Sequence, residues 1–178
     1  MRLFLFLPLF LYLSPPAFAT TMFFVDDVTQ AQQSDAVVIA TIGAAQTKST
    51  PKSIITETQI TVEEVITGAA PATLRIIQTG GTYEGKTLFF PGDARLVEGQ
   101  KVVLFLNEEN GEWFLTALEQ SKYDLEKHPR LGWIMKRQLK EGLVVRDANG
   151  HLVPYKPTQK KPFVFLSDFR AQISNGGE

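Results

Sequence analysis

Residues 54–63 read Ile-Ile-Thr-Glu-Thr-Gln-Ile-Thr-Val-Glu, and their side chains alternate along the chain. One face carries Ile54, Thr56, Thr58, Ile60 and Val62, and the other carries Ile55, Glu57, Gln59, Thr61 and Glu63. A period of two is typical of a β-strand with one buried face. The run is about ten residues long, which is long for a strand. We therefore expect this strand to coil or bend.

Strand signals continue on both sides of this segment. Four further stretches have strand composition: residues 36–42, 73–79, 102–106 and 113–118. They are separated by Gly43 and a polar loop, a turn at 68–71, a long loop over 80–99 and a hairpin loop at 107–111. Five strands with such connections predict an antiparallel sheet that closes on itself.

The last third of the chain has a different pattern. Residues 129–140 have apolar side chains at helical spacing, which predicts a helix. Asn149-Gly150 between residues 143–146 and 151–153 predicts a β-hairpin, followed by a basic, extended stretch over 154–162. Two short helices are also expected, one over 26–34 and one with Ser167 as its N-cap. The fold class is therefore mainly β with short helices (α+β).

The first 19 residues have the features of a cleavable secretory signal peptide. Met1-Arg2 is a short positive region, residues 3–13 are apolar, and Ala17-Phe18-Ala19 fits the small-x-small cleavage pattern. Cleavage after Ala19 leaves Thr20 as the new terminus. No later segment is long and apolar enough to span a bilayer, so we expect no transmembrane segment after cleavage. The predicted location is the periplasm or the extracellular medium.

Residues 20–178 have the size of one domain, and charge divides them into two parts. Residues 20–120 hold 6 basic and 13 acidic side chains, whereas residues 121–178 hold 11 basic and 6 acidic ones. The basic excess could serve an acidic partner, or the two parts could complement each other within the fold. The chain has no cysteine, which excludes disulfides, thiolate metal sites and thiol catalysis.

The sequence contains no recognised catalytic, cofactor or metal motif. Neither a nucleophile elbow nor a phosphate-binding glycine loop is present, and the two histidines lack metal-ligand spacing. We therefore predict no catalytic residue, cofactor or metal. Phe89 and Phe90, in the long loop, are either recognition anchors or a plug for the open end of a small barrel. Trp113 and Trp133 are both expected in the core.

Three blocks within residues 34–120 resemble the inhibitory domain of tissue inhibitors of metalloproteinases and, more broadly, the netrin-like OB-type barrel. These blocks are Ser-Asp-Ala-Val-Val-Ile-Ala at 34–40, Thr-Gln-Ile-Thr-Val-Glu-Glu-Val-Ile-Thr-Gly at 58–68 and Val-Glu-Gly-Gln-Lys-Val-Val-Leu-Phe-Leu at 97–106. The arrangement is also similar to that of cysteine-free exported bacterial domains. The resemblance implies a small closed antiparallel OB-type barrel over 20–120, with 121–178 as a basic helix and hairpin extension.

The resemblance and the missing motifs lead to three functional hypotheses. The first is an exported, non-enzymatic binding or assembly module whose ligand the sequence does not identify, with another exported protein as one candidate partner. The second is an inhibitor of secreted metalloproteases that acts through the Thr20 amine and carbonyl, although without disulfides we expect nothing to pin that terminus. The third is a hydrolase with an unrecognised constellation. The acidic barrel segment makes nucleic acid an unsuitable ligand.

Overall fold

The computed structural model describes residues 22–139, 143–146, 149–156 and 163–175. The strands are β1 (Met22–Phe23), β2 (Ala36–Ser49), β3 (Ile54–Gly68), β4 (Thr73–Thr79), β5 (Gly81–Tyr83), β6 (Lys86–Leu88), β7 (Lys101–Glu109), β8 (Glu112–Leu115), β9 (Lys122–His128), β10 (Gly132–Lys136), β11 (Leu143–Arg146), β12 (Leu152–Pro154) and β13 (Val164–Phe165). The helices are α1 (Asp27–Gln32), the 3-10 helix η1 (Leu118–Ser121) and α2 (Leu166–Asn175). The predicted mainly β class with short helices is confirmed.

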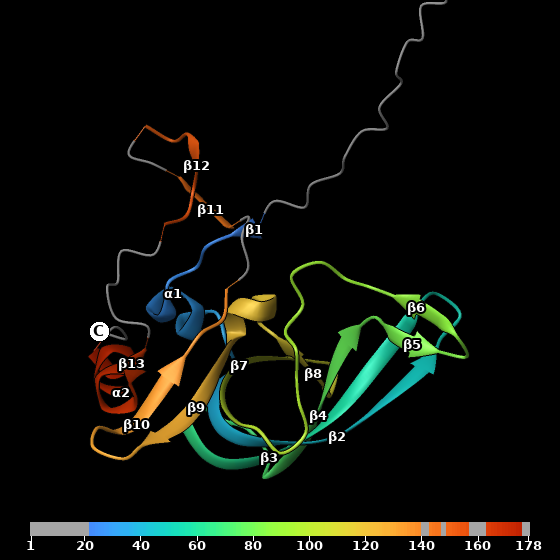
Figure 1. Ribbon diagram of the computed structural model, residues 1–178, viewed down its shortest axis with the longest axis horizontal. Helices are drawn as coiled ribbons and strands as arrows, with labels where there is room; N and C mark the ends of the chain where they lie inside the picture. Colours follow the sequence, from blue (N-terminus) through green and yellow to red (C-terminus); the bar gives the residue numbers. More distant parts are fainter. Residues whose placement is uncertain (1–21, 140–142, 147–148, 157–162, 176–178) are drawn as a thin grey trace, which may run out of the picture.

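Most strands belong to one sheet with the order β13-β10-β9-β7-β2-β3-β4-β8. β8 pairs with β7 over four residues, and it also meets β4 in parallel at the single pair Ile76–Trp113. Five strands are thus linked in the sequence β7-β2-β3-β4-β8 and back to β7. Figure 1 shows the β5–β6 hairpin at one end of the molecule and α2, beside β10, at the other.

The long strand β3 is confirmed, and its partner β2 is longer than expected. β2 passes through Gly43 and the predicted polar loop to Ser49, with a register shift between Ile42 and Ala45. At Gly43 a Cβ atom would lie 3.1 Å from the carbonyl oxygen of Gln59, so glycine suits this close approach of the two strands. The irregularity lets β2 bend and continue, where the sequence suggested an end.

Residues 36–42 of β2 and 102–106 of β7 are buried on both faces, which explains their continuous apolar sequences. Their even-numbered residues, such as Val38 and Leu104, belong to a core shared with Ile60, Leu74 and Ile76. Their odd-numbered residues belong to a second core: Val37, Ile39, Val103 and Phe105 pack with Tyr123, Leu125, Met135, Phe169 and Ile173. The second core contains side chains of both α1 and α2. The sheet is therefore covered by helices on one face and curls over the first core on the other.

The helix predicted over residues 129–140 is wrong. Instead, β9 and β10 form an antiparallel hairpin with five Cα pairs, and Gly132 has a φ of +78°, which suits a turn and not a helix interior. Ile134 and Met135 are both buried although adjacent strand residues point to opposite faces. Burial on both faces imitates helical spacing in a short apolar run, which is the source of the error.

The remaining C-terminal predictions are partly correct. The hairpin of β11 and β12 is confirmed, and β1 joins it in parallel to give a separate three-stranded sheet. α2 begins at Leu166, so Ser167 lies inside the helix and the prediction of Ser167 as N-cap is wrong. Part of the predicted stretch over 154–162 lies outside the described residues. Within the described ranges, no helix has the length and apolar character needed to cross a membrane.

Candidate functional site

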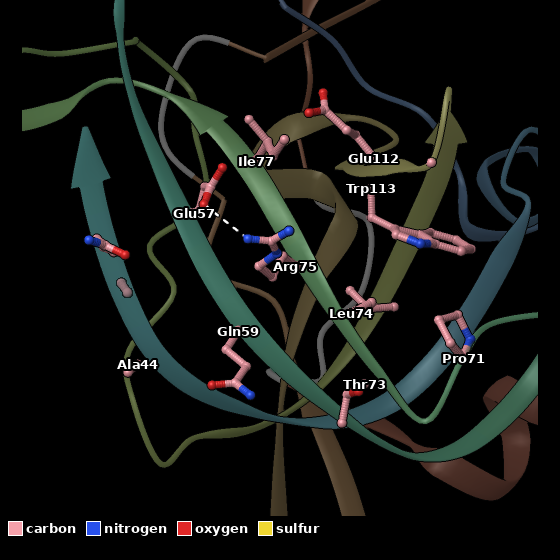
Figure 2. Close-up of a pocket in the computed structure, with 13 residues that line it drawn as sticks. Ala44, Glu57, Gln59, Pro71, Thr73, Leu74, Arg75, Ile77, Glu112 and Trp113 are labelled. Carbon is pink, nitrogen blue, oxygen red and sulfur yellow. Dashed lines mark hydrogen bonds and ion pairs between the residues drawn. The ribbon is translucent and has the colours of Figure 1, made fainter. Parts of the chain in front are cut away.

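An open groove of about 650 Å³ lies on the outer face of β3 and β4 and extends to β8. Glu57 and Gln59 contribute from β3, and Thr73, Arg75 and Ile77 contribute from β4. Ala44, Ala45, Gln46, Pro71, Leu74, Gly111, Glu112 and Trp113 complete its lining. Figure 2 shows how these side chains surround the groove.

Strand alternation puts the polar side chains of the groove on one face. Glu57 pairs with Ile77, Gln59 with Arg75, and Thr61 with Thr73, and directly opposed residues point the same way. The intervening Ile60, Leu74 and Ile76 are buried in the core beneath. The alternation seen in the sequence thus separates the core from the groove.

The charges of the groove are only partly neutralised within the chain. Glu57 forms an ion pair with Lys48, and its second oxygen lies 3.5 Å from Arg75 Nη1 (Figure 2). The hydrogen bond from Lys48 lowers the pKa of Glu57, and the charges of Lys48 and Arg75 add to this effect against partial burial. The Arg75 side chain is 73% exposed. Its guanidinium therefore presents most of its donors to an incoming group.

Trp113 forms the β8 side of the groove. The side chain is partly buried and packs against the first core, which agrees with the expected core role, but it also lines the groove beside Glu112 and Gly111. An aromatic ring fixed by the core at the edge of a polar groove is a rigid contact surface for a ligand. Trp133, by contrast, is 38% exposed with Lys101 Nζ 5.2 Å from its ring centroid, so its predicted core position is wrong.

A second, smaller hollow of about 340 Å³ is lined by charged residues, among them Asp93, Glu119, Lys122 and Asp124. Asp93 accepts from Gln78 at 2.7 Å, and Lys122 Nζ lies 2.8 Å from Asp124 Oδ1, although Oδ1 has no aligned hydrogen bond. These contacts engage Asp93, Lys122 and Asp124 with other groups of the same chain. In the described part of the chain, no group of three His, Cys, Asp or Glu residues could hold a metal ion.

Of the predicted site residues, Thr20 and the cleavage position after Ala19 lie outside the described residues. The chain is nevertheless held two residues further on. β1 pairs with β11, the Gln120 amide donates to the Phe23 carbonyl at 2.8 Å, and its oxygen accepts from Val25 N at 2.9 Å. Phe24 stacks on Tyr155 with ring centroids 3.8 Å apart. These contacts begin at Met22, and the expectation that nothing pins Thr20 itself lies outside the described residues.

Phe89 and Phe90 lie in the loop after β6 and are 71% and 43% exposed. Such exposure does not fit a plug in the end of a barrel, and a recognition role for Phe89 and Phe90 stays a prediction. The loop approaches the amino-terminal strand, because a Cβ atom at Gly92 would lie 2.2 Å from Met22 Sδ. The structure thus brings this loop close to β1.

The sequence did not predict Arg75 and Trp113 of the groove as site residues.

Comparison with known proteins adds no relative: no family model, curated protein or solved structure matches this chain.

Proposed function

We propose that the chain is an exported, non-enzymatic binding module that holds another exported protein in the groove of β3, β4 and β8. The observation that carries this proposal is the groove itself, which is lined by the exposed Arg75 guanidinium, the partly buried Trp113 ring and the acidic side chain of Glu112. Recognition sites in proteins commonly combine a rigid aromatic with a few directed polar groups.

The strand links support an OB-type barrel as the framework. In order along the chain, the five linked strands are β2, β3, β4, β7 and β8. OB-type barrels bind their ligands on the face of the second and third strands and with the loop between the last two. In this chain those parts are β3, β4 and the turn at Gly111, and all three line the groove. The groove therefore occupies the position where such barrels place a ligand.

The charges of the groove favour a protein over a nucleic acid. Arg75 is the only cation among its lining residues, and Glu57 and Glu112 would face a phosphate backbone at close range. Nucleic-acid binding relies on several cations that neutralise phosphates. A protein segment that carries both acidic and basic side chains can pair with Arg75 and with the two glutamates.

The test is co-purification from the exported fraction with a carboxy-terminal tag. We expect one protein to be enriched with the wild-type chain and its recovery to fall at least about tenfold with Arg75→Glu, since a reversed charge in a contact costs more than 1.4 kcal/mol. Arg130→Glu, which reverses the charge of an exposed arginine outside the groove, is the matched control and should leave recovery unchanged. If the Arg75→Glu variant recovers as much of the partner as the wild type does, the groove is not the binding site.

A second candidate is inhibition of secreted metalloproteases through Thr20. The observation that favours it is the set of contacts that holds residues 22–25, because a fixed terminus loses less entropy on binding. One residue added before Thr20 should abolish inhibition of a secreted metalloprotease, measured with a fluorogenic peptide substrate. Inhibition that survives the extension would rule out this mechanism.

A further inference from the structure

We propose that the partner enters the groove as an extended segment of about three residues and adds as a short strand to the edge of β4. The inference rests on the proposed function and names the form in which the partner binds. The relevant edge is Thr73–Arg75, which precedes the single contact between β4 and β8.

The direction of the β4 backbone groups follows from two hydrogen bonds at the ends of the β3–β4 ladder. Val62 N donates to the Ala72 carbonyl at 2.9 Å, and Gly80 N donates to the Ile54 carbonyl at 2.8 Å. Hydrogen-bonded pairs alternate along an antiparallel ladder, and the register between these two bonds is continuous. The even-numbered residues of β4 therefore bond to β3. The amide and carbonyl groups of Thr73 and Arg75 point the other way, toward β8.

The hairpin of β7 and β8 borders the same opening. Thr116 N donates to the Phe105 carbonyl at 3.1 Å, so by the same alternation Trp113 directs its groups away from β7 and toward β4, where the pairing with Ile76 uses them. Gly111 lies in the turn before β8, and its N–H donates to the Glu108 carboxylate. The two strands pair only at Ile76–Trp113. Because they are parallel, Thr73–Arg75 lies opposite Gly111 and Glu112, and both sides line the groove. The opening is thus bordered by the edge of β4 on one side and by the turn before β8 on the other.

Backbone edges of this kind fit a peptide better than a sugar. An extended peptide offers amide and carbonyl groups at the same spacing as β4, so one added residue opposite Thr73 can both donate and accept. The side chains around the opening add selectivity. Arg75 is suited to a carboxylate, and Trp113 and Ile77 offer apolar surface. The segment we infer is therefore extended, with an acidic residue next to an apolar one.

The first test needs no ligand. Amide hydrogen exchange followed by NMR should show Arg75 exchanging at least about tenfold faster than Leu74 and Ile76, whose amides bond to β3. Equal protection of all three amides would contradict the edge that we infer.

The second test uses a linear heptapeptide selected from a phage-displayed library against the mature chain. Thr73→Pro removes one edge amide and leaves the bonds to β3 intact, a position where strands tolerate proline. We expect Thr73→Pro to raise the Kd of the peptide at least about tenfold. Thr73→Val keeps the backbone amide and the branched shape, so it should raise the Kd far less than Thr73→Pro does. N-methylation of the peptide residue opposite Thr73 should weaken binding equally.

The outcomes separate this inference from the proposed function. Binding that falls with Arg75→Glu but not with Thr73→Pro or N-methylation would overturn strand addition and leave the groove as the binding site. Loss of binding with Thr73→Val in a folded protein would assign recognition to the hydroxyl and would also overturn it. Failure to select any heptapeptide that competes with the co-purified partner would do the same. Binding unchanged by every groove variant would overturn both proposals.

Discussion

Two arginine–carboxylate pairs at different places in the molecule show how the same chemistry can serve folding or binding. Arg137 and Asp27 lie 2.7 Å apart with side chains that are 7% and 15% exposed, beneath α1. Arg75 and Glu57 lie 3.5 Å apart, and the Arg75 side chain is 73% exposed. Arg137 is built into the second core, whereas Arg75 stands in water at the groove, although the side chain of its partner Glu57 is only 14% exposed.

The surroundings of the two arginines extend the contrast. The Arg137 guanidinium lies 4.1 Å from the centroid of the Tyr123 ring, and Asp27 also accepts from the Tyr123 hydroxyl at 2.8 Å. Burial raises the pKa of Tyr123, so the phenol remains a neutral donor. Among the described residues, Arg75 has only its contact with Glu57. The buried arginine contributes to the stability of the fold, and the exposed one has donors left for a partner.

The largest expected difference between the two regions concerns apolar packing. Phe169→Ala removes a ring that is fully buried and meets Phe105 edge-on at 5.8 Å, and we expect a loss of about 3–5 kcal/mol in the free energy of unfolding. Ile77→Ala at the groove should cost about 1 kcal/mol, because this side chain is only partly buried. Urea denaturation of both variants measures the difference. Similar losses would break the distinction between a core and a binding face.

The next effect compares the two arginines directly. Arg137→Ala leaves Asp27 without its cation in a buried site, and we expect it to destabilise the fold by about 3 kcal/mol. Arg75→Ala should change stability by less than about 1 kcal/mol, as for other exposed ion pairs. Thermal and urea unfolding at neutral pH measure both.

Arg137→Lys is the informative control for this prediction. It keeps the positive charge but loses the planar group over Tyr123, so its stability should lie between those of the wild type and Arg137→Ala. A destabilisation by Arg75→Ala as large as that by Arg137→Ala would mean that the groove charges hold the fold together, and the comparison would fail.

Much of the strand framework could be predicted from the sequence. β4 was predicted with its observed bounds. The alternation of side chains predicted β3, and an apolar run predicted the beginning of β2. The error at 129–140 arose because Ile134 and Met135 are buried on opposite faces of one strand, a pattern that local periodicity cannot distinguish from a helix. The end of β2 was missed because the strand continues on its ladder with β3 across Gly43.

The groove could not be predicted because its walls meet only in the folded chain. Arg75 and Trp113 are 38 positions apart in sequence, and the opening between them exists because β4 and β8 pair at one residue only. The signal that was present is the polar set on the outer face of neighbouring strands, in particular Glu57 and Arg75. No sequence motif marks the groove, because an unpaired strand edge arises from the topology of the folded sheet.

The smallest expected effect concerns the pKa of Glu57. Because the hydrogen bond from Lys48 is the main cause that lowers this pKa, Lys48→Met should raise it toward its ordinary value of about 4.3, measured by NMR titration of the carboxyl carbon. A lowered pKa in the folded state stabilises the fold above the ordinary pKa, and this contribution is lost as the pH falls through the folded value. The stability difference between wild type and Lys48→Met should therefore be largest at neutral pH and disappear in acid.

Arg75→Met provides the contrast for this last prediction. Arg75 acts on Glu57 only through its charge at 3.5 Å, so its removal should raise the pKa of Glu57 less than the removal of Lys48 does. The opposite order would mean that Glu57 is held chiefly by Arg75. In that case the Arg75 guanidinium would be engaged within the chain, and an acidic residue of the partner would have to displace Glu57 before it could bind.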